Sequence, residues 1–151
     1  MEPKIVSKPA FTVVGVKYRG KNENAEIPQL WRDFGPRMSE IQHKVDDHDC
    51  YGVCANVDHE THEFDYFAAF EVDSTADIPE GMASFEVPEA TYAVFRTTLP
   101  DIGKTFDRAY QAWLPQSGYQ ATGGPDLELY DEEFDPSDPA STFEIYIPIT
   151  K

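Results

Sequence analysis

The sequence predicts an α+β domain made of two βαββ repeats related by pseudo-twofold symmetry. Three observations predict it: short β-branched segments, two longer segments with apolar residues at helical spacing, and the same order of elements occurring twice. A chain of 151 residues fits one domain, here 1–151, with repeats at 5–73 and 82–151. We expect an antiparallel sheet with two helices on one face and a ligand cleft on the other, because ligand sites favour the junction of such halves.

The first repeat has a strand, a helix and a hairpin. Residues 11–18 are apolar and β-branched, which predicts the strand. The apolar stripe that follows has helical spacing but contains Gly-Pro at 35–36, so we expect a helix in two pieces. Segments 51–57 and 64–72 then predict two strands joined by the polar turn 58–62.

The second repeat has the same order. Residues 91–97 predict its first strand, and 83–87 is a candidate strand before it. Apolar residues from Ile102 to Leu114 recur at helical spacing, and this helix is expected to end at Pro115. Strands over 127–134 and 143–149 complete the repeat. A nearly constant offset between matching positions of the two repeats indicates a duplication.

The charge balance excludes several partners. The chain has 28 acidic and 12 basic residues, a formal net charge of −16. Nucleic acid and anionic membranes are bound through Lys and Arg, so neither is expected as a partner, and cationic or neutral ligands are favoured. The acidity is also compatible with a high-salt habitat. The sequence lacks a membrane-spanning apolar run and a secretory leader, which predicts a cytoplasmic protein with reduced cysteines.

Side-chain alternation places a carboxylate beside an aromatic residue at the same position of both repeats. In the last strand the apolar side chains are expected to pack on the helices, with Glu144 and Tyr146 on the opposite face. In the first repeat Asp65 and Phe67 lie opposite the helices in the same way. For the strand before the last, Leu127 and Leu129 are expected to face the helices.

That assignment puts one set of polar and aromatic side chains on the face away from the helices. The expected ligand-binding residues there are Cys54, Asp65, Phe67, Glu128, Tyr130, Glu144 and Tyr146. Aromatic walls with a desolvated carboxylate suit a flat organic cation. The alternative is that these side chains are simply the wet side of a half-buried sheet.

Three segments resemble a known family: AWLPQSGY (112–119), GGPDLELY (123–130) and FEIYIPI (143–149). They are similar to the gyrase-inhibitor-like small-molecule-binding domain, which is the effector-binding part of AraC-type and MerR-type drug-responsive regulators. The resemblance covers essentially the whole chain. It implies a ligand pocket between the repeats, Glu144 as the anion for cationic aromatic compounds, and Glu128 as a second match. It also implies aromatic walls at Tyr130, Tyr146 and Trp113.

The resemblance leaves three functions open. The favoured one is a stand-alone binding domain for amphipathic aromatic or cationic small molecules, without a DNA-binding domain, because residues 11–18 already form the first strand. Some members hydrolyse cyclopropane rings in DNA-alkylating compounds, and Glu144 would then be the catalytic residue, with burial raising its pKa. The third is a protein partner, either gyrase or a regulator.

Metal and cofactor sites are not expected. Cys50, Cys54, His59 and His62 lie close in sequence, but their spacing differs from that of zinc sites. The glycines at 123–124 precede a strand, so no helix N-terminus is available there for a nucleotide phosphate.

Overall fold

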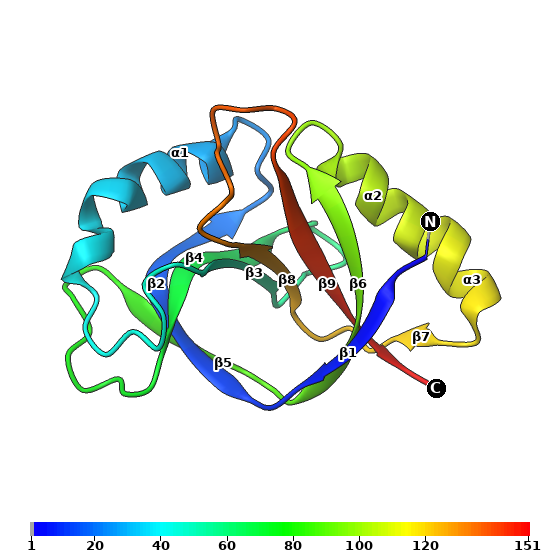
Figure 1. The fold of residues 1–151 in the computed structure, drawn as a ribbon, viewed down its shortest axis with the longest axis horizontal. Helices are drawn as coiled ribbons and strands as arrows, with labels where there is room; N and C mark the ends of the chain where they lie inside the picture. The colour runs from blue at the N-terminus through cyan, green and yellow to red at the C-terminus, as the bar shows by residue number, and fades with distance from the viewer. Residues whose placement is uncertain (1) are drawn as a thin grey trace.

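One curved antiparallel sheet of nine strands forms the body of the protein, and helical segments cover one of its faces (Figure 1). The computed structural model describes residues 2–151. The strands are β1 (Lys4–Lys8), β2 (Phe11–Gly20), β3 (Cys50–Ala55), β4 (Phe64–Val72), β5 (Ala83–Val87), β6 (Ala90–Thr98), β7 (Gln120–Ala121), β8 (Asp126–Tyr130) and β9 (Thr142–Thr150). The helical segments are α1 (Glu26–Phe34), the 3₁₀ turn η1 (Gly35–Glu40), α2 (Ile102–Arg108), the π turn η2 (Ala109–Trp113) and α3 (Leu114–Ser117). The predicted fold class is confirmed.

The two repeats exchange their first strands. The strand order is β1-β6-β9-β8-β3-β4-β2-β5, and β7 pairs with β9. β1 begins the first repeat but pairs with β6 of the second, whereas β5 begins the second repeat and pairs with β2 of the first. The edge strands β1 and β5 therefore come together at the lower end of Figure 1. β1 is not evident in the sequence, because polar residues interrupt its apolar pattern and pairing with β6 supplies its hydrogen bonds.

The helices follow the predicted breaks with one difference. Gly35-Pro36 ends α1 and starts the 3₁₀ turn, as expected. The second helix does not end at Pro115 but continues to Ser117 after a π turn. Pro115 thereby lies in the first turn of α3, where its missing N–H needs no helical acceptor. Gly118 then ends the helix in the left-handed region with φ 84°.

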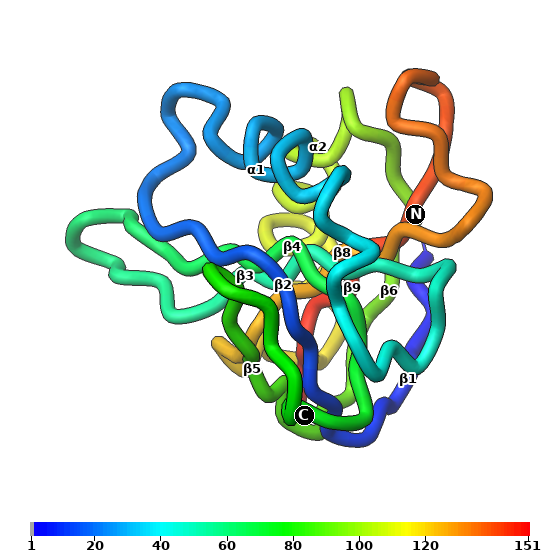
Figure 2. The backbone as a smooth tube through the Cα atoms, turned by 90° about the vertical axis from the view of Figure 1, so that its left-hand side faces the viewer, coloured from blue at the N-terminus to red at the C-terminus, as the bar shows by residue number. Residues whose placement is uncertain are grey.

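Both faces of the sheet carry buried apolar side chains. On the helix side, Ile145 and Ile147 pack with Leu114 in one cluster, and Tyr66 and Phe70 pack with residues of α1 in another, as predicted. The opposite face has its own core, formed by buried residues of all the long strands. Figure 2 shows the β3–β4 connection projecting away from these layers. No helix within residues 2–151 has the length and apolar character needed to cross a bilayer.

The predicted orientation of β8 is wrong. Leu127 and Leu129 pack in the core opposite the helices, while Glu128 and Tyr130 lie on the helix side. The register explains this, because Leu127 pairs with Tyr146, and Glu128 pairs with Ile145, whose side chain faces the helices. The apolar pattern of β8 does not tell which face of the sheet its leucines occupy, since this sheet buries apolar side chains on both faces.

Candidate ligand-binding site

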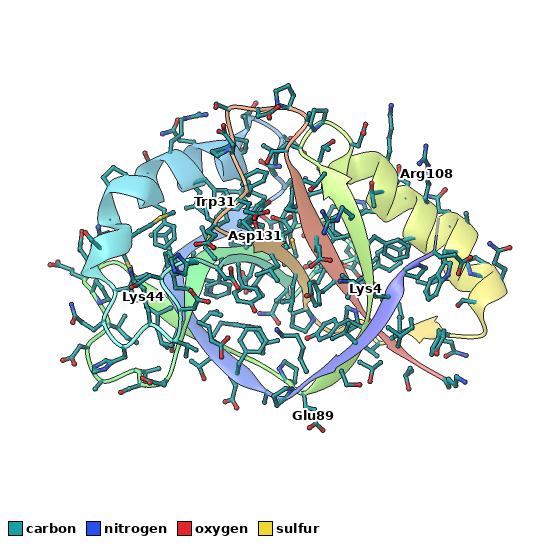
Figure 3. All side chains as sticks on the ribbon, viewed as in Figure 1. Lys4, Trp31, Lys44, Glu89, Arg108 and Asp131 are labelled. Carbon is teal, nitrogen blue, oxygen red and sulfur yellow. The ribbon has the colours of Figure 1, made fainter. Side chains whose placement is uncertain are left out.

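A buried carboxylate marks the centre of the helix side of the sheet. Glu128, on β8, is 8% exposed, and its Oε1 accepts hydrogen bonds from Tyr66 Oη at 2.6 Å and Tyr130 Oη at 2.7 Å. Trp31 Nε1 in turn donates to Tyr66 Oη at 2.9 Å. Three elements, α1, β4 and β8, thus meet at one carboxylate, and Trp31 lies beneath α1 near the middle of the view in Figure 3.

Gly52 makes room for this cluster. It is the β3 partner of Glu128, between the two strands that carry the tyrosines. A Cβ at this position would collide with Tyr66 Oη and with Glu128 Oε1. The carboxylate can therefore lie flat over β3 only because residue 52 has no side chain.

Neutral groups alone hold the Glu128 carboxylate. The ion pairs found within residues 2–151 do not include Glu128, and both of its hydrogen bonds come from phenol hydroxyls. Burial raises the pKa of Glu128, and the hydrogen bonds from Tyr66 and Tyr130 only partly oppose this. Oε2 accepts no hydrogen bond from residues 2–151 and is not fully buried, so it is the oxygen available to a ligand.

Aromatic rings surround the carboxylate. The Trp31 ring lies edge-on to Tyr130 with centroids 5.3 Å apart and edge-on to Tyr66 at 6.5 Å. On its other side Tyr130 stacks on Phe143 at 4.5 Å and packs against Phe134 at 4.9 Å. These rings pack against one another around Glu128, and a flat apolar ligand would have to separate them to reach the carboxylate.

A second carboxyl group continues the site along β8. Asp126 is two residues from Glu128 and therefore on the same face, and Tyr110 Oη donates to its two oxygens at 2.9 and 3.0 Å. Burial raises the pKa of Asp126 to about 7, and the hydrogen bond from Tyr110 opposes this in part. Tyr110 belongs to the π turn η2, a feature often found at functional sites.

The cysteines border the site as neutral thiols. Cys54 pairs with Asp126 across β3 and β8, and Cys50 pairs with Tyr130. Burial raises the pKa of Cys50 to about 12 and that of Cys54 well above its ordinary value. Within residues 2–151 no three His, Cys, Asp or Glu side chains are grouped as metal ligands.

The eight predicted site residues do not all meet. Glu128, Tyr130 and Cys54 lie together on the helix side, not on the predicted opposite face. For Cys54 the reason is that Tyr51 and Val53 of β3 fill the core of the opposite face, so the residues alternating with them point to the helices. Trp113 is also on that side, but it packs on Phe95 and Tyr119. The other four, Asp65, Phe67, Glu144 and Tyr146, point to the opposite face of the sheet.

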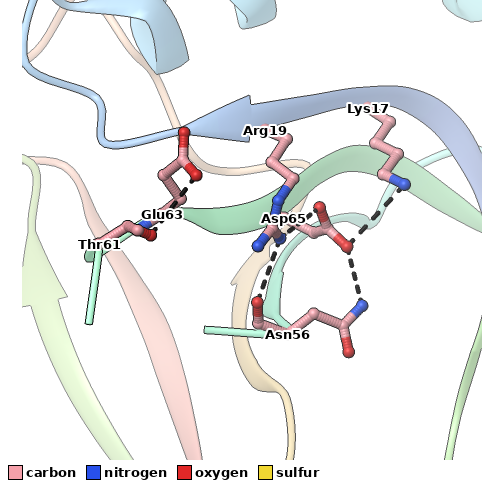
Figure 4. A network of polar contacts seen from close by, with 6 residues as sticks. All are labelled: Lys17, Arg19, Asn56, Thr61, Glu63 and Asp65. Carbon is pink, nitrogen blue, oxygen red and sulfur yellow. Dashed lines mark hydrogen bonds and ion pairs between the residues drawn. The ribbon is translucent and has the colours of Figure 1, made fainter. Parts of the chain in front are cut away.

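The carboxylates on that opposite face have cationic partners within the protein. Asp65 accepts hydrogen bonds from Arg19 Nη1 at 3.0 Å and Asn56 Nδ2 at 2.8 Å, and Lys17 Nζ is 3.8 Å away (Figure 4). Burial raises the pKa of Asp65, but these groups outweigh it and the net shift is downward. Glu144 Oε2 forms an ion pair with Lys4 Nζ at 3.0 Å.

Sequence reasoning missed half of the cluster. Trp31 and Tyr66 belong to apolar helix-packing patterns in the sequence, and such patterns do not reveal the hydrogen bonds that their polar atoms form. Gly52 and Asp126 could have been found from the sequence. A glycine inside a β-branched strand indicates that another group approaches the backbone closely, and Asp126 is two residues from Glu128 and so lies on the same face of β8. Recognising that these residues meet required the register of β3 against β8, which the sequence does not give.

The family is decided by a match over nearly the whole domain. Residues 4–149 match the model of Cass2, described as integron-associated effector binding protein. The chain belongs to this family. The resemblance to gyrase-inhibitor-like effector-binding domains is confirmed with it. This Cass2-family chain is 43% identical over 152 residues to the transcriptional regulator BrlR of Pseudomonas aeruginosa. The match covers 99% of the chain but only 56% of the regulator.

Solved structures share the fold of this Cass2-family domain. SAV2435 bound to tetraphenylphosphonium superposes with a TM-score of 0.80 at 19% identity, covering 99% of this chain and 94% of the other. The Vibrio cholerae integron cassette protein VCH_CASS2 superposes with a TM-score of 0.68 at 20% identity, covering 99% and 96%. At these identities the likeness concerns the fold.

Proposed function

We propose that this effector-binding domain binds an amphipathic aromatic cation on the helix side of its sheet, with Glu128 as the anion. The observation that supports this most directly is a buried carboxylate held only by hydroxyl groups. A carboxylate in that setting gains more from an incoming cation than one that already has a cationic partner.

The aromatic surroundings favour the same class of ligand. Trp31, Tyr66 and Tyr130 place aromatic rings beside the carboxylate, and these would line the space that a ligand opens there. A delocalised organic cation has apolar area for the rings and a charge for Glu128, and its weak hydration lowers the cost of burial. SAV2435, which shares the fold, has been solved with such a cation, tetraphenylphosphonium.

Glu128 is a better candidate for the anchor than Glu144 or Asp65. A ligand cation at Glu144 would have to displace Lys4, and one at Asp65 would have to displace Arg19. At Glu128 it would displace neutral groups instead. The obstacle there is Trp31, whose indole lies against both tyrosines, so we expect α1 or the Trp31 side chain to move when ligand enters.

The test is a calorimetric titration of tetraphenylphosphonium into the wild type, Glu128→Gln and Glu144→Gln. Glu128→Gln is expected to weaken binding roughly 30-fold or more, the usual consequence of losing one partner of a buried charge pair. Glu144→Gln is the matched control and should bind like the wild type. The neutral analogue triphenylphosphine oxide should bind weakly to all three proteins.

Two results would contradict the proposal. One is equal affinity of the wild type and Glu128→Gln for tetraphenylphosphonium. The other is a loss of affinity in Glu144→Gln alone, which would move the site to the opposite face of the sheet.

A further inference from the structure

A lysine of the protein lies inside a group of aromatic rings on the sheet face opposite the helices. Lys8 Nζ is 5.2 Å from the ring centroid of Phe11, 5.5 Å from that of Tyr51 and 5.6 Å from that of Tyr146. It also donates a hydrogen bond to Tyr51 Oη at 3.2 Å. The rings come from β2, β3 and β9, and each distance is within the range of a cation–π contact. We call these three rings the Lys8 cage.

The cage is electrostatically suited to a cation. Its phenols remain neutral at physiological pH, because burial raises the pKa of Tyr51 strongly and that of Tyr146 to about 12. The negative charges of Glu144 and Asp49 act on Tyr146, and those of Glu71 and Asp49 act on Tyr51. Ring faces and nearby carboxylates thus both favour positive charge at this position.

The other repeat has an apolar side chain at the position equivalent to Lys8. Lys8 pairs with Ala90 at the start of β6, and Val87 pairs in the same way with Phe11 at the start of β2. Val87 of edge strand β5 is therefore the counterpart of Lys8 of edge strand β1, and it is fully buried. A valine fills such a position permanently, but a lysine is a cation on a flexible stem that can leave it.

A surface hollow beside the cage can take up the Lys8 side chain when it is displaced. It lines a surface hollow of ≈ 490 Å³ at the corner between β1 and β2, and the exposed Glu89 lines the same hollow. Figure 3 shows Glu89 at that lower end of the molecule. A displaced Lys8 ammonium would therefore have both solvent and a carboxylate nearby.

We propose that the Lys8 cage is a second cation-binding site of this domain, occupied by Lys8 itself until a small methylated ammonium ion replaces it. A quaternary ammonium is more weakly hydrated than the lysine head group and fits between three rings without needing hydrogen bonds. This site lies across the sheet from Glu128 and does not depend on the function proposed for that residue.

The test uses tetramethylammonium as the probe, with binding followed through the ring-proton NMR signals of Tyr51 and Tyr146. Lys8→Ala opens the cage and is expected to bind the probe about tenfold more tightly than the wild type. Lys104→Ala is the matched control, because Lys104 is an exposed lysine of α2 and lies on the helix side of the sheet, away from the cage. It should bind the probe like the wild type, and Glu128→Gln should too.

The wild type provides a measurement that does not require a variant to fold. Lys8 methylene protons inside the cage should have ring-current-shifted signals, and these should move toward ordinary lysine values as the probe is added. Unshifted Lys8 signals, no response to the probe, or equal affinity of wild type and Lys8→Ala would overturn the proposal. The neutral alcohol 3,3-dimethylbutan-1-ol carries a tert-butyl group of nearly the same size as the probe. If it bound Lys8→Ala as tightly as tetramethylammonium does, the proposal would also be overturned, since this would show an apolar gap rather than a cation site.

Discussion

Two buried carboxylates, one on each face of the sheet, are held in opposite ways. Asp65 is 5% exposed and surrounded by Arg19, Lys17 and Asn56, whereas Glu128 is 8% exposed and bonded only to hydroxyl groups. Their pKa values shift in opposite directions, downward for Asp65 and upward for Glu128. Burial outweighs the two phenol hydrogen bonds at Glu128, whereas the cationic and amide partners outweigh burial at Asp65.

Asp65 carries a structural charge, whereas under the proposed function Glu128 carries a charge for a ligand. The charge of Asp65 is compensated within the chain, and it ties β2 to the start of β4 and to Asn56. The buried charge of Glu128 lowers the stability of the folded domain. A bound cation would compensate that charge, and the recovered free energy would contribute to binding affinity. The same chemical substitution should therefore have opposite effects at the two positions.

The largest effect is expected from Gly52→Ala, which removes the space that keeps Glu128 in its place. Because the added Cβ would collide with both Tyr66 and Glu128, we expect a loss of ~2–3 kcal/mol in the free energy of unfolding, typical of overpacking. Urea denaturation measures it. Gly103→Ala is the control: it has open space within a helix and should gain about 0.5–1 kcal/mol. Equal effects of the two substitutions would show that Gly52 is not needed for space.

Asp65→Asn should destabilise the domain by ~2 kcal/mol at neutral pH, because it removes a charge that accepts hydrogen bonds from Arg19 and Asn56. Since the folded-state pKa of Asp65 is below its ordinary value of 3.8, this stabilisation is present above that value and is lost as pH falls through the folded pKa. The difference between wild type and variant should accordingly shrink in acid. Glu40→Gln, in the exposed pair with Arg37, should have no measurable effect.

The smallest effect, with the opposite sign, is expected for Glu128→Gln. The folded-state pKa of Glu128 is above its ordinary value of 4.5, so the wild type is most stable below that value and loses stability as pH rises through the folded pKa. Removing the charge should raise the free energy of unfolding by about 1 kcal/mol at a pH above the folded-state pKa of Glu128. Thermal denaturation of both proteins across pH measures it. A destabilised variant at alkaline pH would mean that the Glu128 charge is compensated after all.

Most of the fold follows from local patterns. Periodicity located the long strands, both helices and the Gly35-Pro36 break, because apolar spacing and the proline constraint act within a few residues. It missed β1, whose partner strand is more than eighty residues away in the sequence. It also reversed the two faces of β8, where leucines and an acidic residue with a tyrosine alternate and either set can be buried.

The sequence by itself determined the two-repeat architecture, the family and the residue types from which a cation site can be built. Only the tertiary structure decided which carboxylate is left without a cation. Side-chain alternation limits Glu128, Asp65 and Glu144 to one of two faces, but the partner of each depends on strand register and on the residue opposite. Gly52 opposite Glu128, Arg19 opposite Asp65 and Lys4 beside Glu144 are long-range pairings, and these set the electrostatics of the three carboxylates.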